Sequence, residues 1–163
     1  MFFFKNKCNF AANIFNQRIM NNEKCDDSYS DLKDAKILLV DDNPVNQKIV
    51  LISIQNLVNS IDVANNGQEA IDKFASGCYD VIIMDIQMPV MDGVQATRKI
   101  REMEVERGLL RTPIIGNTAH SAGEERDRCM KAGMDDGFFG IPLKAKDLKD
   151  LVLKMYNQKK SQC

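Results

Sequence analysis

The sequence contains no tryptophan, one histidine and four prolines among its 163 residues. No apolar run approaches the roughly 18 residues that a membrane-spanning helix needs, so we expect no span. A single histidine excludes any metal site built on two histidines of this chain. The five cysteines are scattered, odd in number and form no Cys-x-x-Cys pair. They predict reduced thiols rather than a disulfide framework or a zinc site.

The sequence also lacks an excess of either charge. Lysine and arginine number 22 against 23 aspartates and glutamates, which leaves a net charge of −1. Without a basic excess we expect no nucleic-acid partner. The length suits a single domain with a real core. These features together predict a soluble protein, cytoplasmic or otherwise intracellular.

The amino-terminal segment differs in composition from the rest. Residues 1–33 are rich in asparagine and show no sustained periodicity, so we expect a poorly ordered leader. The opening MFFF is too short for a signal-peptide core, although a targeting or membrane-surface role for the leader stays an open alternative. We place the main domain at residues 34–158, followed by a short tail at 159–163.

From residue 34 the pattern alternates between strand and helix five times. Expected strands are KILLV (36–40), IDVA (61–64), YDVIIMD (79–85), TPIIGNT (112–118) and GFFG (137–140). Expected helices cover 44 to about 59, 67–77, 92 into the charged stretch that ends at 108, 121–132 and 146–157. Such alternation predicts an α/β fold with a parallel sheet and helices on both faces.

Polar residues follow three of these strands. Asp41 and Asp42 end the first, Asp85 ends the third and Thr118 ends the fourth. In open parallel sheets the carboxyl ends of strands meet at one edge, where ligands bind. Converging carboxylates repel one another unless a cation intervenes, and oxygen ligands of this kind suit Mg²⁺. We therefore predict that Asp85 is a nucleophile beside a magnesium ion.

Simpler explanations apply to some of these residues. A helix-capping turn could account for the two acids after the first strand, but Asn43 already supplies that cap. Asp92 is fully explained as the N-cap of the third helix, and we assign it no chemistry. An ordinary strand-end hydroxyl remains an alternative for Thr118. The methionines are typical of gap-filling core residues.

Five motifs of the sequence read VDDNPVNQKI, NNGQEA, MDIQMPVMDG, PIIGNTAHS and AGMDDGFF. Together they closely resemble the receiver domain of two-component response regulators, most of all receivers attached to hybrid histidine kinases. The resemblance covers about residues 34–157. It implies a flavodoxin-like fold of five βα units, whose parallel sheet has the strand order 2-1-3-4-5.

The resemblance also implies roles for individual residues. Asp85 would accept a phosphoryl group from a phosphohistidine on a histidine kinase or a histidine phosphotransfer protein. Asp41, Asp42, Asp85 and the main-chain carbonyl of Gln87 would hold Mg²⁺, and Thr118 would hydrogen-bond the phosphoryl oxygens. Phosphoryl transfer depends on positioning and charge neutralisation, which suits so small a site. Such a domain is no enzyme beyond its own phosphorylation and dephosphorylation.

One group of the family pattern is missing. The family has a lysine directly before the proline that follows strand five, but Ile141 precedes Pro142 here. Counting forward from Thr118 leads to Gly140 instead, so neither alignment supplies a lysine. Aligning on the proline makes Phe138 the switch aromatic. We expect phosphorylation to persist, with weaker conversion into a conformational signal.

Several alternatives stay open. Lys144 could replace the missing lysine, and a cis bond before Pro142 could hold the turn. A pseudo-receiver would keep the fold as a docking module without regulated phosphorylation. An aspartyl-phosphate hydrolase would use the same nucleophile, but it wants an acid where Gln87 stands. A flavodoxin would need a phosphate-binding loop after the first strand, and the acidic DDNP argues against one.

The first helix carries two apolar stripes at 100° per residue. The core-facing stripe comprises Val50, Ile54, Leu57 and Val58. The second stripe comprises Val45, Ile49 and Ile52, which the core does not need. We expect the second stripe to dock a helical phosphotransfer partner. Burial of Ile49 in the core is the alternative.

Overall fold

The computed structural model describes residues 27–118, 123–135, 137–140 and 144–162. The strands are β1 (Lys36–Val40), β2 (Ser60–Ala64), β3 (Val81–Asp85), β4 (Ile114–Asn117) and β5 (Phe138–Phe139). The helices are η1 (Asp27–Asp34, a 3₁₀ helix), α1 (Pro44–Ile54), α2 (Gly67–Ser76), α3 (Gly93–Arg107), α4 (Glu124–Ala132) and α5 (Ala145–Lys160). No helix in this described part of the chain is long and apolar enough to cross a membrane.

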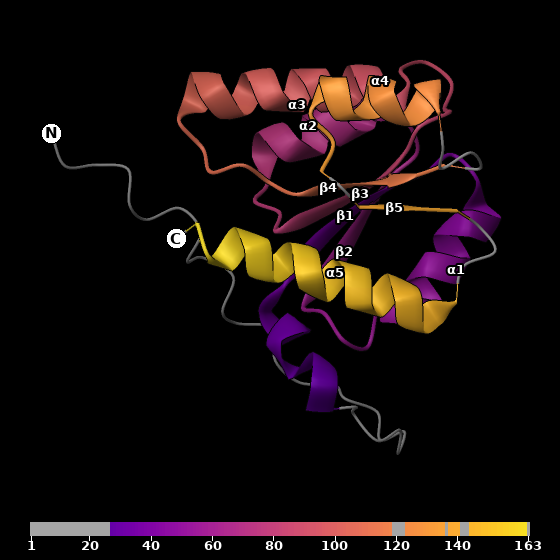
Figure 1. Cartoon of the computed structure of the whole chain (residues 1–163), viewed down its shortest axis with the longest axis vertical. Coiled ribbons are helices and arrows are strands. Elements are labelled where there is room, and N and C mark those ends of the chain that lie inside the picture. Colours follow the sequence, from indigo (N-terminus) through magenta and orange to yellow (C-terminus); the bar gives the residue numbers. More distant parts are fainter. Residues whose placement is uncertain (1–26, 119–122, 136, 141–143, 163) are drawn as a thin grey trace, which may run out of the picture.

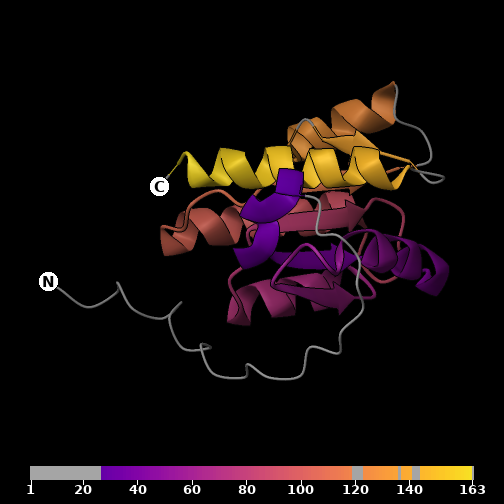
Figure 2. The ribbon, with the colours of Figure 1, turned by 90° about the horizontal axis from the view of Figure 1, so that it is seen from below.

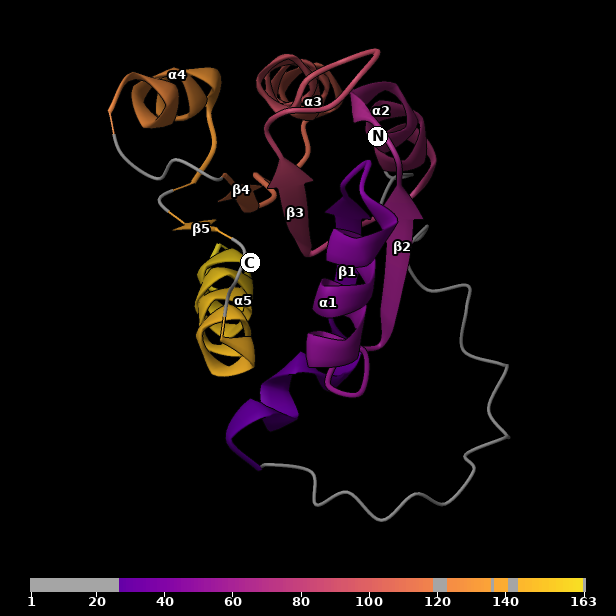
Figure 3. The same ribbon diagram turned by 90° about the vertical axis from the view of Figure 1, so that its right-hand side faces the viewer.

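The strands form one parallel sheet in the order β2-β1-β3-β4-β5. Helices α1 and α5 cover one face, and α2, α3 and α4 cover the other (Figures 1 and 3). The predicted doubly wound, flavodoxin-like fold and its strand order are therefore confirmed. The sequence order changes direction between β1 and β3, and the carboxyl ends of these two strands form the edge where ligands bind in such folds.

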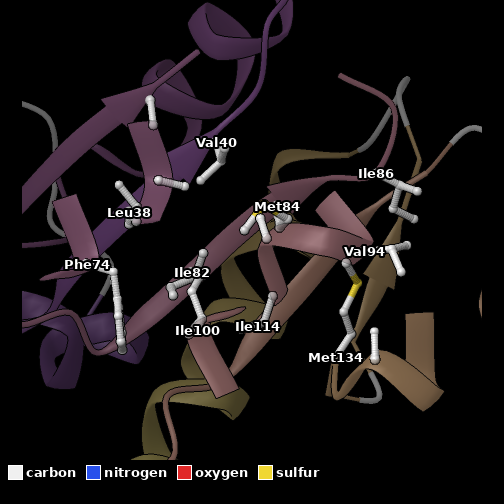
Figure 4. Packing of buried hydrophobic residues seen from close by; sticks show 14 of the residues in the cluster. Leu38, Val40, Phe74, Ile82, Met84, Ile86, Val94, Ile100, Ile114 and Met134 are labelled. Carbon is white, nitrogen blue, oxygen red and sulfur yellow. The ribbon is translucent and has the colours of Figure 1, made fainter. Parts of the chain in front are cut away.

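The central strands are apolar on both sides because each face meets a helical layer. Along β3, Ile82 and Met84 pack toward α2, α3 and α4, whereas Val81 and Ile83 pack toward α1 and α5. Figure 4 shows the first of these two cores, where side chains from β1, β3 and β4 meet those of the covering helices. Burial on both faces explains the continuous apolar run of the sequence.

Helices α1 and α3 start at their predicted caps, whereas the end of α1 differs from its prediction. The Asn43 side chain accepts a hydrogen bond from the Val45 backbone N–H at 2.9 Å, with Pro44 at the first helical position. Helix α1 stops at Ile54, so the predicted end near residue 59 is wrong. The Asn59 N–H donates to the Ala35 carbonyl, which draws the chain into β2 before the helix can continue.

Other boundaries shift by a few residues. Both β4 and β5 are shorter than predicted, and α5 runs past residue 157 to Lys160. Within the described residues α4 begins at Glu124, and the expected start at Ser121 lies outside them. Lys159, in the segment expected as a tail, donates from Nζ to the Tyr79 carbonyl and to the Thr112 hydroxyl.

The 3₁₀ helix η1 packs against α5 although it precedes the predicted domain boundary at residue 34 (Figure 2). Tyr29 and Leu32 are buried in the core, and the Tyr29 hydroxyl donates to the Asp150 carboxylate at 2.6 Å. The packed unit therefore includes η1. Two apolar side chains within a single turn give too little periodicity to reveal such a segment in the sequence. Residues 1–26 lie outside the described residues.

Candidate functional site

Three carboxylates come together at the carboxyl ends of β1 and β3. The two strands are neighbours, with Val40 aligned to Met84, so the residues after Val40 reach the same edge as Asp85. One carboxylate oxygen from each of Asp41, Asp42 and Asp85 lies within 4.8 Å of the others. The structure thus brings together the three acids that the sequence analysis selected as metal ligands.

Asp41 is the buried member of this trio, with 1% of its surface exposed. One of its carboxylate oxygens accepts hydrogen bonds from the Asn43 backbone N–H at 2.8 Å and the Asn46 amide at 3.4 Å. The other accepts one from the Asn117 amide at 3.2 Å. Burial raises the pKa of Asp41; these hydrogen bonds lower it, and the charge of Asp42 adds to the rise. All three donors are neutral groups.

Asp85 is half-buried at the end of β3. Burial raises its pKa to about 6, and the negative charges of Asp41 and Asp42 act in the same direction. Hydrogen bonds from the Gln87 and Ile86 backbone N–H groups oppose the rise. Within the described residues, no lysine or arginine forms an ion pair with Asp85. The carboxylate is therefore ionised at neutral pH at an electrostatic cost that a cation would remove.

The loop after β3 is tightly folded. A Cβ on Gly93 would lie 2.1 Å from the Asp85 carbonyl oxygen, so only glycine fits there. The Met91 N–H donates to the Pro89 carbonyl at 2.8 Å, and Val90 between them has a φ of 70°. Positive φ is strained for a β-branched residue. This turn leaves the Val90 side chain 83% exposed beside the site.

The Asp92 side chain caps α3 as predicted, accepting a hydrogen bond from the Gln95 N–H at 2.7 Å.

Thr118 follows β4 at the same edge of the sheet. Its backbone N–H donates to the Phe139 carbonyl at 2.8 Å, which fixes it beside β5. Its hydroxyl donates to the Glu125 carboxylate at 3.0 Å. The other oxygen of that carboxylate accepts a hydrogen bond from the Gln87 side-chain amide at 3.1 Å. Gln87, expected to offer its main-chain carbonyl to a metal, also donates its backbone N–H to Asp85 at 3.4 Å.

Sequence reasoning missed several polar residues of this site. Asn117 gave a signal that could have been used, because it is an amide in an otherwise apolar strand and is buried. Asn46 and Gln47 lie on the first turn of α1, where Gln47 donates to the Asp41 carbonyl at 2.6 Å. Glu125 had no sequence signal, since it stands among other charged residues of α4.

The strand register bears on the missing lysine. Gly116 pairs with Phe138 and Asn117 with Phe139, which places Gly140 next to Thr118. A Cβ on Gly140 would lie 2.8 Å from the Thr118 carbonyl oxygen. Which of the two alignments places the missing lysine stays a prediction. Ile141, Pro142 and the predicted cis bond between them lie outside the described residues.

Phe138 lies on the face of the sheet that α4 covers. A ring carbon of Phe138 lies 2.6 Å from the position that a Cβ on Gly116 would take. The ring is partly buried against the core. The Arg126 guanidinium lies 5.4 Å from the ring centroid, within the range of a cation–π contact. Whether Phe138 is a switch aromatic stays a prediction.

The donor set at the trio suits Mg²⁺. Among the described residues it consists of carboxylate oxygens alone, and burial has raised the pKa of two of the acids. Hard divalent cations prefer such oxygen ligands, and magnesium typically takes one or two carboxylates together with water and phosphate. The three aspartates therefore fit the ion that the sequence analysis predicted.

The second stripe of α1 is exposed. Val45 is 63% exposed, Ile52 62% and Ile49 37%, whereas Val50 and Ile54 are buried in the core. The remaining core-stripe residues, beyond the end of α1, are partly buried against the same core: Leu57 and Val58. The stripe begins one turn from the acidic trio, because α1 starts three residues after Asp41.

Comparisons with known proteins agree on one family. A family model of the response regulator receiver domain matches residues 37–153. Hybrid signal transduction histidine kinase L of Dictyostelium discoideum is 42% identical over 123 residues, which cover 74% of this chain and 7% of that protein. Sensor protein GacS of Pseudomonas syringae is 35% identical, covering 73% of this chain and 13% of that protein. The chain thus corresponds to a small part of these relatives.

Solved structures give the same answer. The receiver domain of a Pseudomonas aeruginosa sensor histidine kinase, with magnesium coordinated in its active-site cleft, is 34% identical with a TM-score of 0.67. That match covers 76% of this chain and 98% of the other. The receiver domain of Ssk1 from Saccharomyces cerevisiae, crystallised with the histidine phosphotransfer protein Ypd1, is 25% identical with a TM-score of 0.72, covering 78% and 92%. The chain belongs to the response regulator receiver domain family.

Proposed function

We propose that this receiver domain accepts a phosphoryl group on Asp85 from a phosphohistidine of a partner protein. The observation that carries the proposal is the trio of Asp41, Asp42 and Asp85, with oxygens within 4.8 Å of one another and no basic partner among the described residues. Such a cluster is costly unless a cation offsets its charge, and a bound cation can in turn hold an anionic substrate. The matched family and its hybrid-kinase relatives support the same function.

The transfer is a single displacement at phosphorus. An ionised oxygen of Asp85 attacks, a P–O bond forms and the P–N bond of phosphohistidine breaks. The electron pair of the broken bond stays on the imidazole nitrogen, which takes a proton from solvent. The product is an acyl phosphate on Asp85. The Thr118 hydroxyl, at the neighbouring strand end, then donates to a phosphoryl oxygen.

Asp41, Asp42, Asp85 and the main-chain carbonyl of Gln87 would hold Mg²⁺. When bound, the ion supplies positive charge that offsets the carboxylates and the phosphoryl oxygens. Asp41 is fixed by its three neutral donors, so it keeps its orientation whether or not a ligand is present. The chain would catalyse only its own phosphorylation and dephosphorylation.

The test is incubation with acetyl phosphate, with and without Mg²⁺, followed by intact-mass measurement. We expect the mass gain of one phosphoryl group in the presence of Mg²⁺, and its loss in Asp85→Asn. Asp92→Asn is the matched control, because Asp92 only caps α3 and keeps a capping side chain. Phosphorylation of Asp85→Asn at the rate of the unchanged protein would refute the assignment.

The exposed stripe of Val45, Ile49 and Ile52 supports a docking role in the same reaction. The Ssk1 receiver, a structural neighbour, is bound to a histidine phosphotransfer protein. We propose that a helical partner of this type packs on the stripe and brings its phosphohistidine to Asp85. Replacing Val45 and Ile52 by Asp should slow transfer from such a partner and leave acetyl phosphate labelling intact.

Val105→Asp is the control for this surface experiment. Val105 is 82% exposed near the end of α3, so it offers a similar change at another place. It should leave both reactions unchanged. Equal losses from the two donors in the stripe variant would contradict the docking proposal.

A pseudo-receiver is the second candidate, and two observations favour it. No lysine stands at residues 140 or 141, and the Thr118 hydroxyl is engaged by Glu125. A pseudo-receiver would gain no mass from acetyl phosphate under any condition, yet would still bind its partner through the α1 stripe. The mass experiment therefore separates the two functions.

A further inference from the structure

Glu125 touches the candidate site from α4, a helix with no other assigned part in the proposed reaction. Its two carboxylate oxygens accept hydrogen bonds from the Thr118 hydroxyl at 3.0 Å and the Gln87 amide at 3.1 Å. Thr118 follows β4 and Gln87 follows β3. One carboxylate therefore joins α4 to the ends of two strands that flank Asp85.

These contacts conflict with a phosphorylated Asp85. A hydroxyl has one hydrogen, so Thr118 cannot donate to Glu125 and to a phosphoryl oxygen at the same time. Phosphorylation of Asp85 adds negative charge near the Glu125 carboxylate, in a region that already contains several acidic side chains. Both effects favour separation of Glu125 from the site once Asp85 is modified.

We propose that Glu125 is a positioning residue that holds Thr118 and Gln87 in the unphosphorylated site and is displaced when Asp85 is phosphorylated. The inference rests on the proposed function. In this proposal the conformational signal arises from repulsion between the phosphoryl group on Asp85 and the Glu125 carboxylate. Residues 140 and 141, where the family pattern would place its lysine, are glycine and isoleucine.

Helix α4 is suited to respond to this displacement. Two of its nine residues, Cys129 and Ala132, are buried. Its N-cap is Gly123, which has a φ of 85° and forms no side-chain capping hydrogen bond. Elements with few buried contacts and poorly held ends open at low free energy. The Glu125 contacts are among those that hold the first turn of α4 to the sheet, together with Arg126 over Phe138.

The next residue extends the coupling. Arg126 lies over the ring of Phe138 on β5, at 5.4 Å from the centroid. Movement of Glu125 shifts Arg126 as well, because the two residues are adjacent in the same helical turn. The first turn of α4 therefore links the phosphoryl-accepting edge to the aromatic residue that the sequence analysis selected as a switch.

The experiment compares the unchanged full chain with Glu125→Gln and Glu124→Gln. Each is treated with acetyl phosphate and Mg²⁺, and we measure the phosphorylation rate by intact mass and amide hydrogen exchange across residues 123–132. Glutamine keeps the shape of Glu125 but removes its charge, and it replaces one of the two accepting oxygens by a donating amide. We expect Glu125→Gln to be phosphorylated faster by up to about fivefold, the effect that one unit charge would have at about 4 Å in water. Glu124→Gln is the matched control because Glu124 is an exposed neighbour on the same turn.

Exchange gives the second measurement. In the unchanged protein we expect faster exchange in α4 once Asp85 is phosphorylated, and in Glu125→Gln a smaller difference between the two forms. Glu124→Gln should behave as the unchanged protein in both measurements. A mass gain on Asp85 without altered α4 exchange, or a Glu125→Gln rate equal to or below that of the unchanged protein, would overturn this inference alone. No mass gain at all would overturn the proposed function and this inference with it.

Discussion

Carboxylates at the amino and carboxyl edges of the sheet differ in the charge of their partners. At the amino edge, Glu104 accepts from the Arg101 guanidinium at 2.6 Å and from the Thr112 N–H at 2.6 Å. Asp135 pairs with Arg101 at 3.0 Å and Arg111 at 3.3 Å, and accepts from the Ile114 N–H. At the carboxyl edge, the described partners of Asp41 and Asp85 are neutral amide groups.

The difference separates structural acids from functional ones. Glu104 and Asp135 at the amino edge have cations of the chain itself, which neutralise their charges and stabilise the fold. Acids at the carboxyl edge have neutral donors that fix their orientation without neutralising them. Ligand binding removes the electrostatic cost of these charges. A ligand that binds at the carboxyl edge therefore stabilises the folded protein.

The largest expected effect is at the amino edge. Arg101→Met should lower the free energy of unfolding by about 3 kcal/mol, because it leaves the largely buried Glu104 and Asp135 without their shared cation. Urea unfolding at pH 7 measures the change. Arg98→Met is the control: Arg98 is exposed on the same helix and should change stability by less than about 0.5 kcal/mol. Similar losses in the two variants would show that the ion pairs contribute little.

Magnesium should act on the other edge. At a concentration about 100-fold above its Kd, Mg²⁺ should raise the free energy of unfolding by about 2.7 kcal/mol. Asp42→Asn should reduce this gain, whereas Asp80→Asn, at the amino end of β3, should keep it. Sodium chloride of equal ionic strength serves as the salt control. An equal gain from sodium would mean that charge screening, not a specific site, stabilises the protein.

The smallest expected effect concerns Asp85 without metal. Folding raises its pKa from 3.8 to about 6, so the folded state binds the proton more tightly than the unfolded chain does. The free energy of unfolding therefore falls as the pH rises between these values, and the loss is complete above them. Asp85→Asn removes the loss, and should stabilise the protein at pH 7 by about 1 kcal/mol after allowance for solvent screening of a half-exposed group.

Near pH 3.5 the same variant should have little advantage, because Asp85 is then mostly protonated in both states. Thermal unfolding in EDTA at pH 7 and at pH 3.5 tests this sign. A gain that is equal at the two pH values would trace the stabilisation to something other than charge.

The sequence predicted the fold well where burial decides it. The unbroken apolar run of β3 and the caps Asn43 and Asp92 depend on local chemistry, and the structure has them where they were expected. The end of α1 was wrong because the Asn59 backbone joins the sheet ladder through Ala35, a contact between distant residues. Segment η1 was missed for the same reason, because Tyr29 and Leu32 are buried by the packing of η1 against the distant helix α5.

The acids of the site could be predicted because strand ends in a parallel sheet share an edge. Their neutral donors could not, because Asn46 and Asn117 become neighbours of Asp41 only in three dimensions. Glu125 shows the limit most clearly. Its sequence surroundings are those of a solvated helical face, and its two partners are reached across 7 and 38 residues of chain.

The attachment of η1 has a mechanical consequence. The segment lies directly before β1, and β1 has a hydrogen-bonded neighbour on each side. A force that pulls on the chain from its amino-terminal side would act on η1 first, because Tyr29 is bonded to Asp150 and Leu32 is buried in the core. The force would then first separate η1 from α5. The strand that carries Asp41 and Asp42 at its far end would keep its register until that anchor failed.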